Sequence, residues 1–270
     1  MSYIPMEPRQ NNLLSALSDD VMDRLYPHLE FVALPMGEVL YESGDDRRNV
    51  YFPVDCIVSL MQDIENGSSA EISMVGNEGI VGINAFMGGD GSPWRAVVQT
   101  AGFAYRLPGK LLREEFDRHG EMLQLMMRYT QSRITQMSQA AVCNRHHSID
   151  QQVCRWLLQS LDRLSSTTIT MTQELLSHAL GVRREGVTVA AGKLHKLGVI
   201  EYSRGKITVL DRNKLESLSC ECYGVVRKET ERLLPVMHQD EQSFVWTNKR
   251  LESGVGRARI KRTIDDLVVA

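Results

Sequence analysis

The spacing of apolar residues changes several times along the chain, and each change marks a different kind of predicted element. Residues 13–30 follow a helical period and predict two short helices, with Ser18 as the N-cap of the second. From Phe31 onward the apolar residues form short runs, separated by turns rich in Gly, Pro, Asn and Asp. These runs span residues 31–34, 39–41, 57–61, 70–74, 96–100 and 103–107. Strands at this close spacing, with a hairpin signal at Asn66-Gly67, predict an antiparallel β-barrel or jelly roll.

A helical period returns after Pro108-Gly109 and contains the most regular apolar stripe in the sequence. Its members are separated by alternating steps of four and three residues: Leu123, Met127, Thr130, Ile134, Met137 and Ala141. So narrow a stripe predicts one long helix over residues 119–145 that pairs with its own copy in a two-fold homodimer. The other faces of this helix carry polar side chains: Gln124, Arg128, Gln131, Arg133 and Gln136. The alternative is that the helix packs its stripe on the barrel of its own chain.

The segment after residue 148 predicts a helix over 148–164, a polar connection over 165–168 and then a helix-turn-helix. Thr170 and Thr172 are alternative N-caps for the first helix of the pair, and Gly181 supplies the positive φ that ends it. The second helix ends at Gly198. Two short β runs around residues 203–206 follow and predict a hairpin wing with two cations at its tip.

The second helix of the pair turns an apolar stripe inward and presents a polar face suited to the major groove of DNA. Arg184 can give two donors to guanine, Glu185 can accept from the cytosine amino group, and Thr188 can touch a thymine methyl group or a phosphate. The full set of candidate DNA-contacting residues is Thr172, Arg183, Arg184, Glu185, Thr188, Lys196, Arg204 and Lys206.

The composition is that of a folded protein, and the distribution of charge limits a nucleic-acid-binding surface to one part of the chain. The 270 residues are 43% hydrophobic and 24% charged, which indicates two folded domains. The net charge of −3 offers no global attraction for polyanions, yet residues 165–216 hold eight basic against five acidic side chains. Residues 235–270 predict a basic, solvated tail; the alternative is an auxiliary arm that contacts phosphates.

Several protein classes are excluded on the sequence pattern. The longest stretches without a charged residue have eleven residues, too few for a membrane span, and no signal peptide is visible, so we expect a cytoplasmic protein. No enzyme motif occurs, and the sequence predicts no catalytic residue, cofactor or metal site. The five cysteines are expected to be buried thiols. Metal or redox activity is left open for four of them: Cys143, which precedes His147 by one helical turn, Cys154, and the C-x-C pair Cys220 and Cys222.

The order of parts resembles the Crp/Fnr family of bacterial transcription regulators over residues 13–216. Residues 34–45 (LPMGEVLYESGD) and 50–53 (VYFP) are similar to the start of a cyclic-nucleotide-binding-type domain, and Arg184-Glu185 matches the Arg-Glu pair of the family's recognition helix. The resemblance implies an α+β fold and a homodimer that binds double-stranded DNA, with RNA polymerase as a further candidate partner. It implies a sensory β-barrel over 1–118, a dimerisation helix over 119–145, a winged helix-turn-helix domain over 146–234 and a tail over 235–270.

The effector site is where the sequence departs from the family pattern. Members that bind cyclic AMP carry a Gly-Glu pair and, about ten residues later, an Arg followed by Ser or Thr and Ala; here Ser92-Pro93-Trp94 stands in the latter place. The candidate effector residues are therefore the nearby Glu78, Gly79, Trp94 and Arg95. This predicts that cyclic AMP is not the effector and leaves open another small-molecule or dinucleotide effector, or none. The alternative function is a ligand-binding regulatory module that acts through protein contacts.

Overall fold

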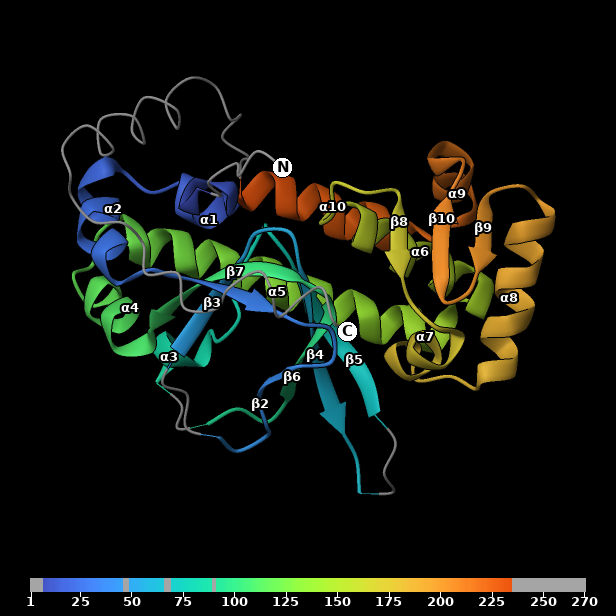
Figure 1. Cartoon of the computed structure of the whole chain (residues 1–270), viewed down its shortest axis with the longest axis horizontal. Coiled ribbons are helices and arrows are strands. Elements are labelled where there is room, and N and C mark those ends of the chain that lie inside the picture. The colour runs from blue at the N-terminus through green and yellow to red at the C-terminus, as the bar shows by residue number, and fades with distance from the viewer. Residues whose placement is uncertain (1–6, 46–48, 66–68, 89–90, 235–270) are drawn as a thin grey trace.

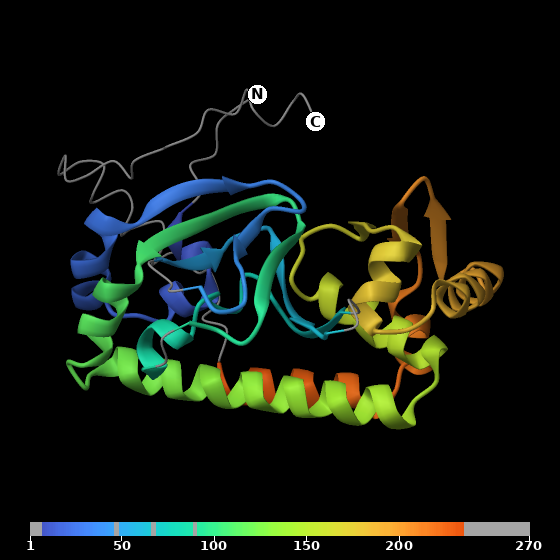
Figure 2. The same ribbon diagram turned by 90° about the horizontal axis from the view of Figure 1, so that it is seen from below.

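The computed structural model describes residues 7–45, 49–65, 69–88 and 91–234, which form two lobes joined by one long helix. Helix α5 (Glu121–His146) runs beneath both lobes (Figure 2). The tail at 235–270 and the Asn66-Gly67 turn lie outside the described residues. Within those residues, no helix has the length and apolar character needed to cross a membrane.

The N-terminal lobe consists of two antiparallel sheets covered by short helices. One sheet has the order β1-β7-β3 and the other β2-β6-β4-β5. The strands are β1 (Glu30–Leu34), β2 (Val39–Tyr41), β3 (Asn49–Pro53), β4 (Ile57–Asp63), β5 (Ser69–Val75), β6 (Arg95–Thr100) and β7 (Gly102–Pro108). The helices are α1 (Asn12–Ser15), α2 (Asp19–Leu25), α3 (Asn84–Met87) and α4 (Gly109–Phe116). All six predicted strands are confirmed, and β3 is a seventh.

Helix α5 buries one face on its own lobe and leaves the predicted stripe largely outside. Its buried face includes Met126 and Tyr129, which are fully buried in the N-terminal core. In the stripe, Met127 is 58% and Ile134 is 53% exposed. Ala141 is exposed, and the other three members, Leu123, Thr130 and Met137, are half-buried. Two residues placed on the polar faces are in fact buried: Arg133 and Gln136, each 2% exposed. They are buried because they bind polar groups of the barrel, which the pattern along one helix does not reveal.

The C-terminal lobe is a winged helix-turn-helix whose core around Trp156 also includes Ile57 and Met74 of the barrel. Its elements are α6 (Ile149–Leu161), β8 (Thr168–Thr170), α7 (Gln173–Leu180), α8 (Arg184–Lys196), β9 (Ile200–Ser203), β10 (Lys206–Val209) and α9 (Arg212–Leu218). The three strands pair antiparallel in the order β8-β10-β9. Strand β8 is an addition to the prediction: the stretch expected to be a polar connection and a cap pairs with the wing.

The last described helix, α10 (Glu221–Leu233), leaves the winged lobe and returns along α5 (Figure 1). Leu233 and Leu234 at its end join the core of the N-terminal lobe. Its start packs near the end of α5, where Cys220 and Cys222 meet Cys143 in a separate buried cluster. The helix thus spans both lobes, whereas the sequence assigns residues 146–234 to the winged domain alone.

Candidate nucleic-acid interface

The turn between α7 and α8 is built by local hydrogen bonds. Thr172 is the N-cap of α7, and its hydroxyl accepts from the backbone N–H of Leu175 at 3.1 Å. At the other end Gly181 adopts φ +64°, and the N–H of Val182 donates to the Ser177 carbonyl at 3.0 Å. These bonds each satisfy one free backbone group at an end of α7 and set the direction in which the chain enters α8. The predicted helix-turn-helix is confirmed.

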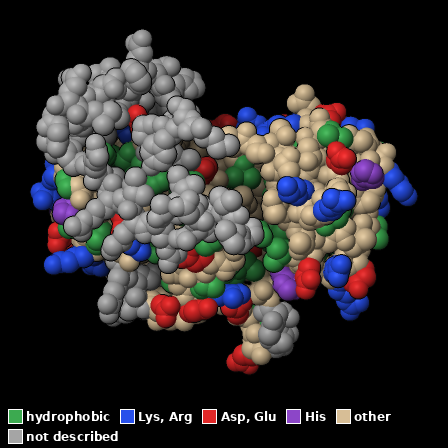
Figure 3. Space-filling view, in the orientation of Figure 1, with side chains coloured by type: hydrophobic (Ala, Val, Ile, Leu, Met, Phe, Trp, Pro, Cys, Tyr) green, Lys and Arg blue, Asp and Glu red, His purple; other side chains and the backbone are tan. Residues whose placement is uncertain are grey.

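Helix α8 has one buried and one exposed face. Its buried residues are Val187, Ala190, Ala191 and Leu194, the apolar stripe expected from the sequence. Arg183, Arg184 and Glu185 are exposed at its start, and Arg183 has no side-chain capping bond. Figure 1 places α8 at the outer edge of the winged lobe, and Figure 3 shows Lys and Arg side chains at this edge. The uncapped N–H groups and the helix dipole add to this positive character.

The cations of this surface differ in whether they already have an acidic partner. Within residues 7–45, 49–65, 69–88 and 91–234, no ion pair involves the cations at the start of α8, at its end or on the wing: Arg183, Arg184, Lys196, Arg204 and Lys206. Lys193, on the same helix, instead pairs with Asp150 of α6 at 2.7 Å. The five unpaired cations are free to meet phosphates or base edges.

Two of the candidate residues have structural partners. The hydroxyl of Thr188 lies 2.7 Å from Oε1 of Gln173 and 3.0 Å from the carbonyl of Arg184, so it helps to hold α8 against the start of α7. The hydroxyl of Thr172 is used by the cap. Gln173, which the sequence interpretation overlooked, follows a cap residue and faces α8. Polar residues just after an N-cap are a usable signal for such a position.

The wing is a tight hairpin with its charges at the tip. Arg204 and Gly205 form its turn with φ +49° and +75°, the left-handed pair that a two-residue hairpin requires. Arg204 and Lys206 are exposed. On the other side of the sheet, the hydroxyls of Thr168 and Thr208 lie 3.0 Å apart and tie β8 to β10. The predicted wing is therefore held on a three-stranded base.

The candidate effector residues occupy different environments. Glu78 accepts from Arg163 at 2.9 Å and from Arg133 at 3.4 Å, linking the loop after β5 to α5 and to the segment after α6. Arg95 pairs with Asp63 at 3.3 Å. Glu78 and Arg95 therefore each already have an ion-pair partner, and no partner is common to both.

The other two effector candidates pack against apolar or aromatic side chains. Gly79 lies so close to α5 that a Cβ at this position would be 2.4 Å from the hydroxyl of Tyr129. Trp94 is half-buried and packs against both N-terminal cores.

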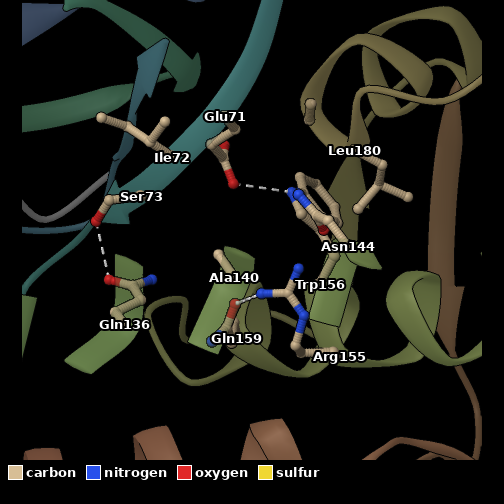
Figure 4. A pocket seen from close by; sticks show the side chains of 11 residues that line it. Glu71, Ile72, Ser73, Gln136, Ala140, Asn144, Arg155, Trp156, Gln159 and Leu180 are labelled. Atoms are coloured by element: carbon tan, nitrogen blue, oxygen red, sulfur yellow. Dashed lines mark hydrogen bonds between the residues drawn. The ribbon is translucent and has the colours of Figure 1, made fainter. Parts of the chain in front are cut away.

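A polar joint connects the barrel to the winged lobe. Residues of β5, α5, α6 and α7 line a cavity between the lobes (Figure 4). Its volume is about 10 Å³, which is room for at most one water molecule. Across it, Glu71 accepts from the indole N–H of Trp156 at 3.2 Å, and Ser73 donates to Gln136 at 2.9 Å. Desolvation of its carboxylate raises the pKa of Glu71. The joint is a packed contact rather than a ligand site.

An antiparallel β-barrel joined by a long helix to a winged helix-turn-helix is the architecture of a class of DNA-binding regulators. Family comparison agrees: residues 31–119 match the cyclic nucleotide-binding domain and residues 151–218 the Crp-like helix-turn-helix domain. Together these ranges take in more than half of the chain, which belongs to the Crp/Fnr family of transcription regulators. No curated protein sequence matches the chain significantly.

Solved structures of the family share this fold at low sequence identity. FixK2 from Bradyrhizobium japonicum is 15% identical, with a TM-score of 0.62 over 71% of this chain and 98% of its own. A Crp/Fnr-family regulator from Eubacterium rectale is 15% identical, with a TM-score of 0.60 over 78% of this chain and 98% of its own. CLP from Xanthomonas campestris, described as a c-di-GMP-responsive global regulator, is 15% identical, with a TM-score of 0.56 over 72% of this chain and 100% of its own.

Proposed function

We propose that the chain acts as a homodimer that reads a pseudo-palindromic DNA site with α8 and holds the flanking backbone with the wing. The observation that carries this proposal is the set of exposed, unpaired cations at the start of α8 and at the wing tip. Arg184 reads a base edge, while Arg204 and Lys206 neutralise phosphates. A two-fold dimer would place its two α8 helices in successive major grooves, about 34 Å apart.

The exposed apolar stripe of α5 supports the homodimer. Met127 and Ile134 present large apolar side chains to solvent, whereas Met137 of the same stripe packs against the barrel core. In a two-fold dimer each stripe would cover its copy, and the two winged lobes would be held at a fixed spacing. Contact with RNA polymerase stays a prediction.

The experiment is the selection of bound sites from random DNA by purified full-length protein. We expect an enriched sequence with two inverted half-sites whose centres are separated by about one helical turn. Arg184→Ala should lose the preference at one position of each half-site, whereas the control Arg232→Ala, an exposed arginine of α10, should select the same sequence. Enrichment of no sequence by the wild-type protein would contradict the proposal.

We further propose that cyclic AMP is not the effector of the barrel. The support is that Arg95 and Glu78, which would have to replace the family's phosphate and ribose contacts, are paired with Asp63 and with Arg163. Calorimetric titration with cyclic AMP should therefore give no heat of binding, and a submicromolar dissociation constant would refute this. Cyclic di-GMP is the first dinucleotide to titrate in the same experiment, because the structurally similar CLP is described as responsive to it.

A further inference from the structure

Four side chains of the kinds that can bind a metal ion converge where α5, α6 and α10 meet. Cys143 lies in the last turn of α5, and His147 is the C-cap of that helix. Cys220 is the N-cap of α10, and Cys222 lies in its first turn. The ligand atoms of these four residues all lie within 4.8 Å of one another. Residues from two distant parts of the sequence thus meet at one point of the fold.

The distances within this cluster suit a single tetrahedral ion. The sulfurs of Cys143 and Cys220 are 3.5 Å apart, and the sulfur of Cys222 lies 3.5 Å from Nδ1 of His147. A tetrahedral zinc ion with bonds of about 2.3 Å to sulfur and about 2.0 Å to nitrogen places its ligand atoms about 3.5 to 3.8 Å apart. The four protein ligands of an iron–sulfur cluster are divided among two or more irons, so the set as a whole spreads over a larger distance than the 4.8 Å found here, which fits one ion.

Burial and the surroundings of the cluster also favour a closed site. The three cysteines are at most 4% exposed. Nε2 of His147 lies 3.3 Å from a carboxylate oxygen of Glu221, an arrangement that orients a metal-binding imidazole and leaves Nδ1 facing the sulfurs.

We propose that Cys143, His147, Cys220 and Cys222 bind one zinc ion as a structural site with four protein ligands. Binding deprotonates the three thiols and releases their protons to solvent, while the neutral imidazole coordinates through Nδ1. The ion fastens the end of α5 to the start of α10 where the chain enters the DNA-binding lobe. It therefore fixes the orientation of this lobe on the long helix.

The first test is made on the full-length wild-type protein, purified under reducing conditions. Elemental analysis should find about one zinc ion per chain, and exchange with cobalt should give the visible absorption of tetrahedral cobalt with sulfur-to-metal charge-transfer bands. Zinc at about a tenth of an ion per chain or less together with no tetrahedral cobalt spectrum would overturn the proposal. So would iron with acid-labile sulfide, or a Cys143–Cys220 disulfide in protein never exposed to oxidant.

Variants separate coordination from simple burial. Cys222→Ser and His147→Ala should lose most of the zinc, and a chelator should lower the melting temperature of the wild type but not of these variants. The matched control is Cys154→Ser, which changes a buried cysteine of α6 outside the cluster and should keep the full zinc content. Equal zinc in all three variants would refute the assignment. These measurements use no DNA, so their outcome is independent of the proposed DNA site.

Discussion

Helix α5 offers a quantitative test of the homodimer through Ile134. Fully burying an isoleucine side chain contributes about 1.5 to 3 kcal/mol, and 53% of this residue is still exposed in the single chain. A two-fold interface that covers the remainder would gain about 0.8 to 1.6 kcal/mol from each copy. In the proposed dimer the pair of isoleucines would therefore contribute about 2 to 3 kcal/mol.

Ile134→Ala removes most of this contribution, although the remaining methyl group retains a part of it. Because 1.4 kcal/mol corresponds to a factor of ten, we expect the dimer dissociation constant to rise about ten- to hundredfold. Sedimentation velocity over a dilution series measures this constant directly. The melting temperature of the monomer should change little, since the side chain is already half in water.

The control for this experiment is Leu210→Ala. Leu210 is 59% exposed, much as Ile134 is, but it follows the wing strand β10 in the other lobe. It should leave the dimer dissociation constant unchanged. The reasoning is refuted if Ile134→Ala leaves dimerisation within about twofold of the wild type, or if both variants weaken it equally.

Three further predictions concern the wing, the joint and the α5 contact. Arg204→Ala should weaken binding to all DNA sequences alike and reduce the slope of log affinity against log salt by about 1, as measured by fluorescence anisotropy. Glu71→Gln should raise the melting temperature at neutral pH. Desolvation raises the pKa of Glu71 above its ordinary value of 4.5, so the folded state binds the carboxyl proton more tightly than the unfolded state does. The wild type therefore loses stability as the pH rises above 4.5, and the neutral glutamine avoids this loss. Gly79→Ala should cost about 1 to 3 kcal/mol in the free energy of unfolding, because the new methyl group displaces Tyr129.

Each of these predictions has an outcome that contradicts it. An unchanged salt slope for Arg204→Ala would mean that the wing does not touch phosphate. The advantage of Glu71→Gln over the wild type should be present at pH 8 and absent below pH 4.5, where the carboxyl group is protonated. An equal difference in melting temperature at pH 4 and pH 8 would show that the buried carboxylate has no desolvation cost. Gly79→Ala with wild-type stability would show that Tyr129 moves freely; Gly120→Ala, where a Cβ meets nothing within 4 Å, is the matched control.

Capping, turn chemistry and hydrophobic periodicity predict those parts of the molecule whose structure is determined within a few residues of sequence. The α7–α8 turn at Gly181 and the hairpin at Arg204-Gly205 follow from capping and turn chemistry within a few residues. The α5 stripe follows from one helical period. By contrast, Arg133 is buried because Glu78 and the carbonyl of Met74, both far from it in sequence, lie against α5.

The cysteine cluster shows the same limit more sharply. The spacing of Cys143 and His147 places both on one side of a helix, and the C-x-C pair follows only after the whole winged domain. Nothing in either pattern states that α10 returns to the end of α5. The four side chains meet because α10 packs along α5, and that packing depends on apolar contacts distributed over both lobes.

Sequence-specific DNA binding by α8 is tested most directly by comparing the affinities of the wild type and of Arg184→Ala for two DNA sites. The affinities of the wild type and of Arg184→Ala are measured at one salt concentration for the selected DNA site and for a scrambled site of the same composition. We predict that the wild type prefers its site and that the variant loses about 1 to 3 kcal/mol of this preference. An unaltered ratio between the two sites in the variant would contradict the claim that α8 reads DNA.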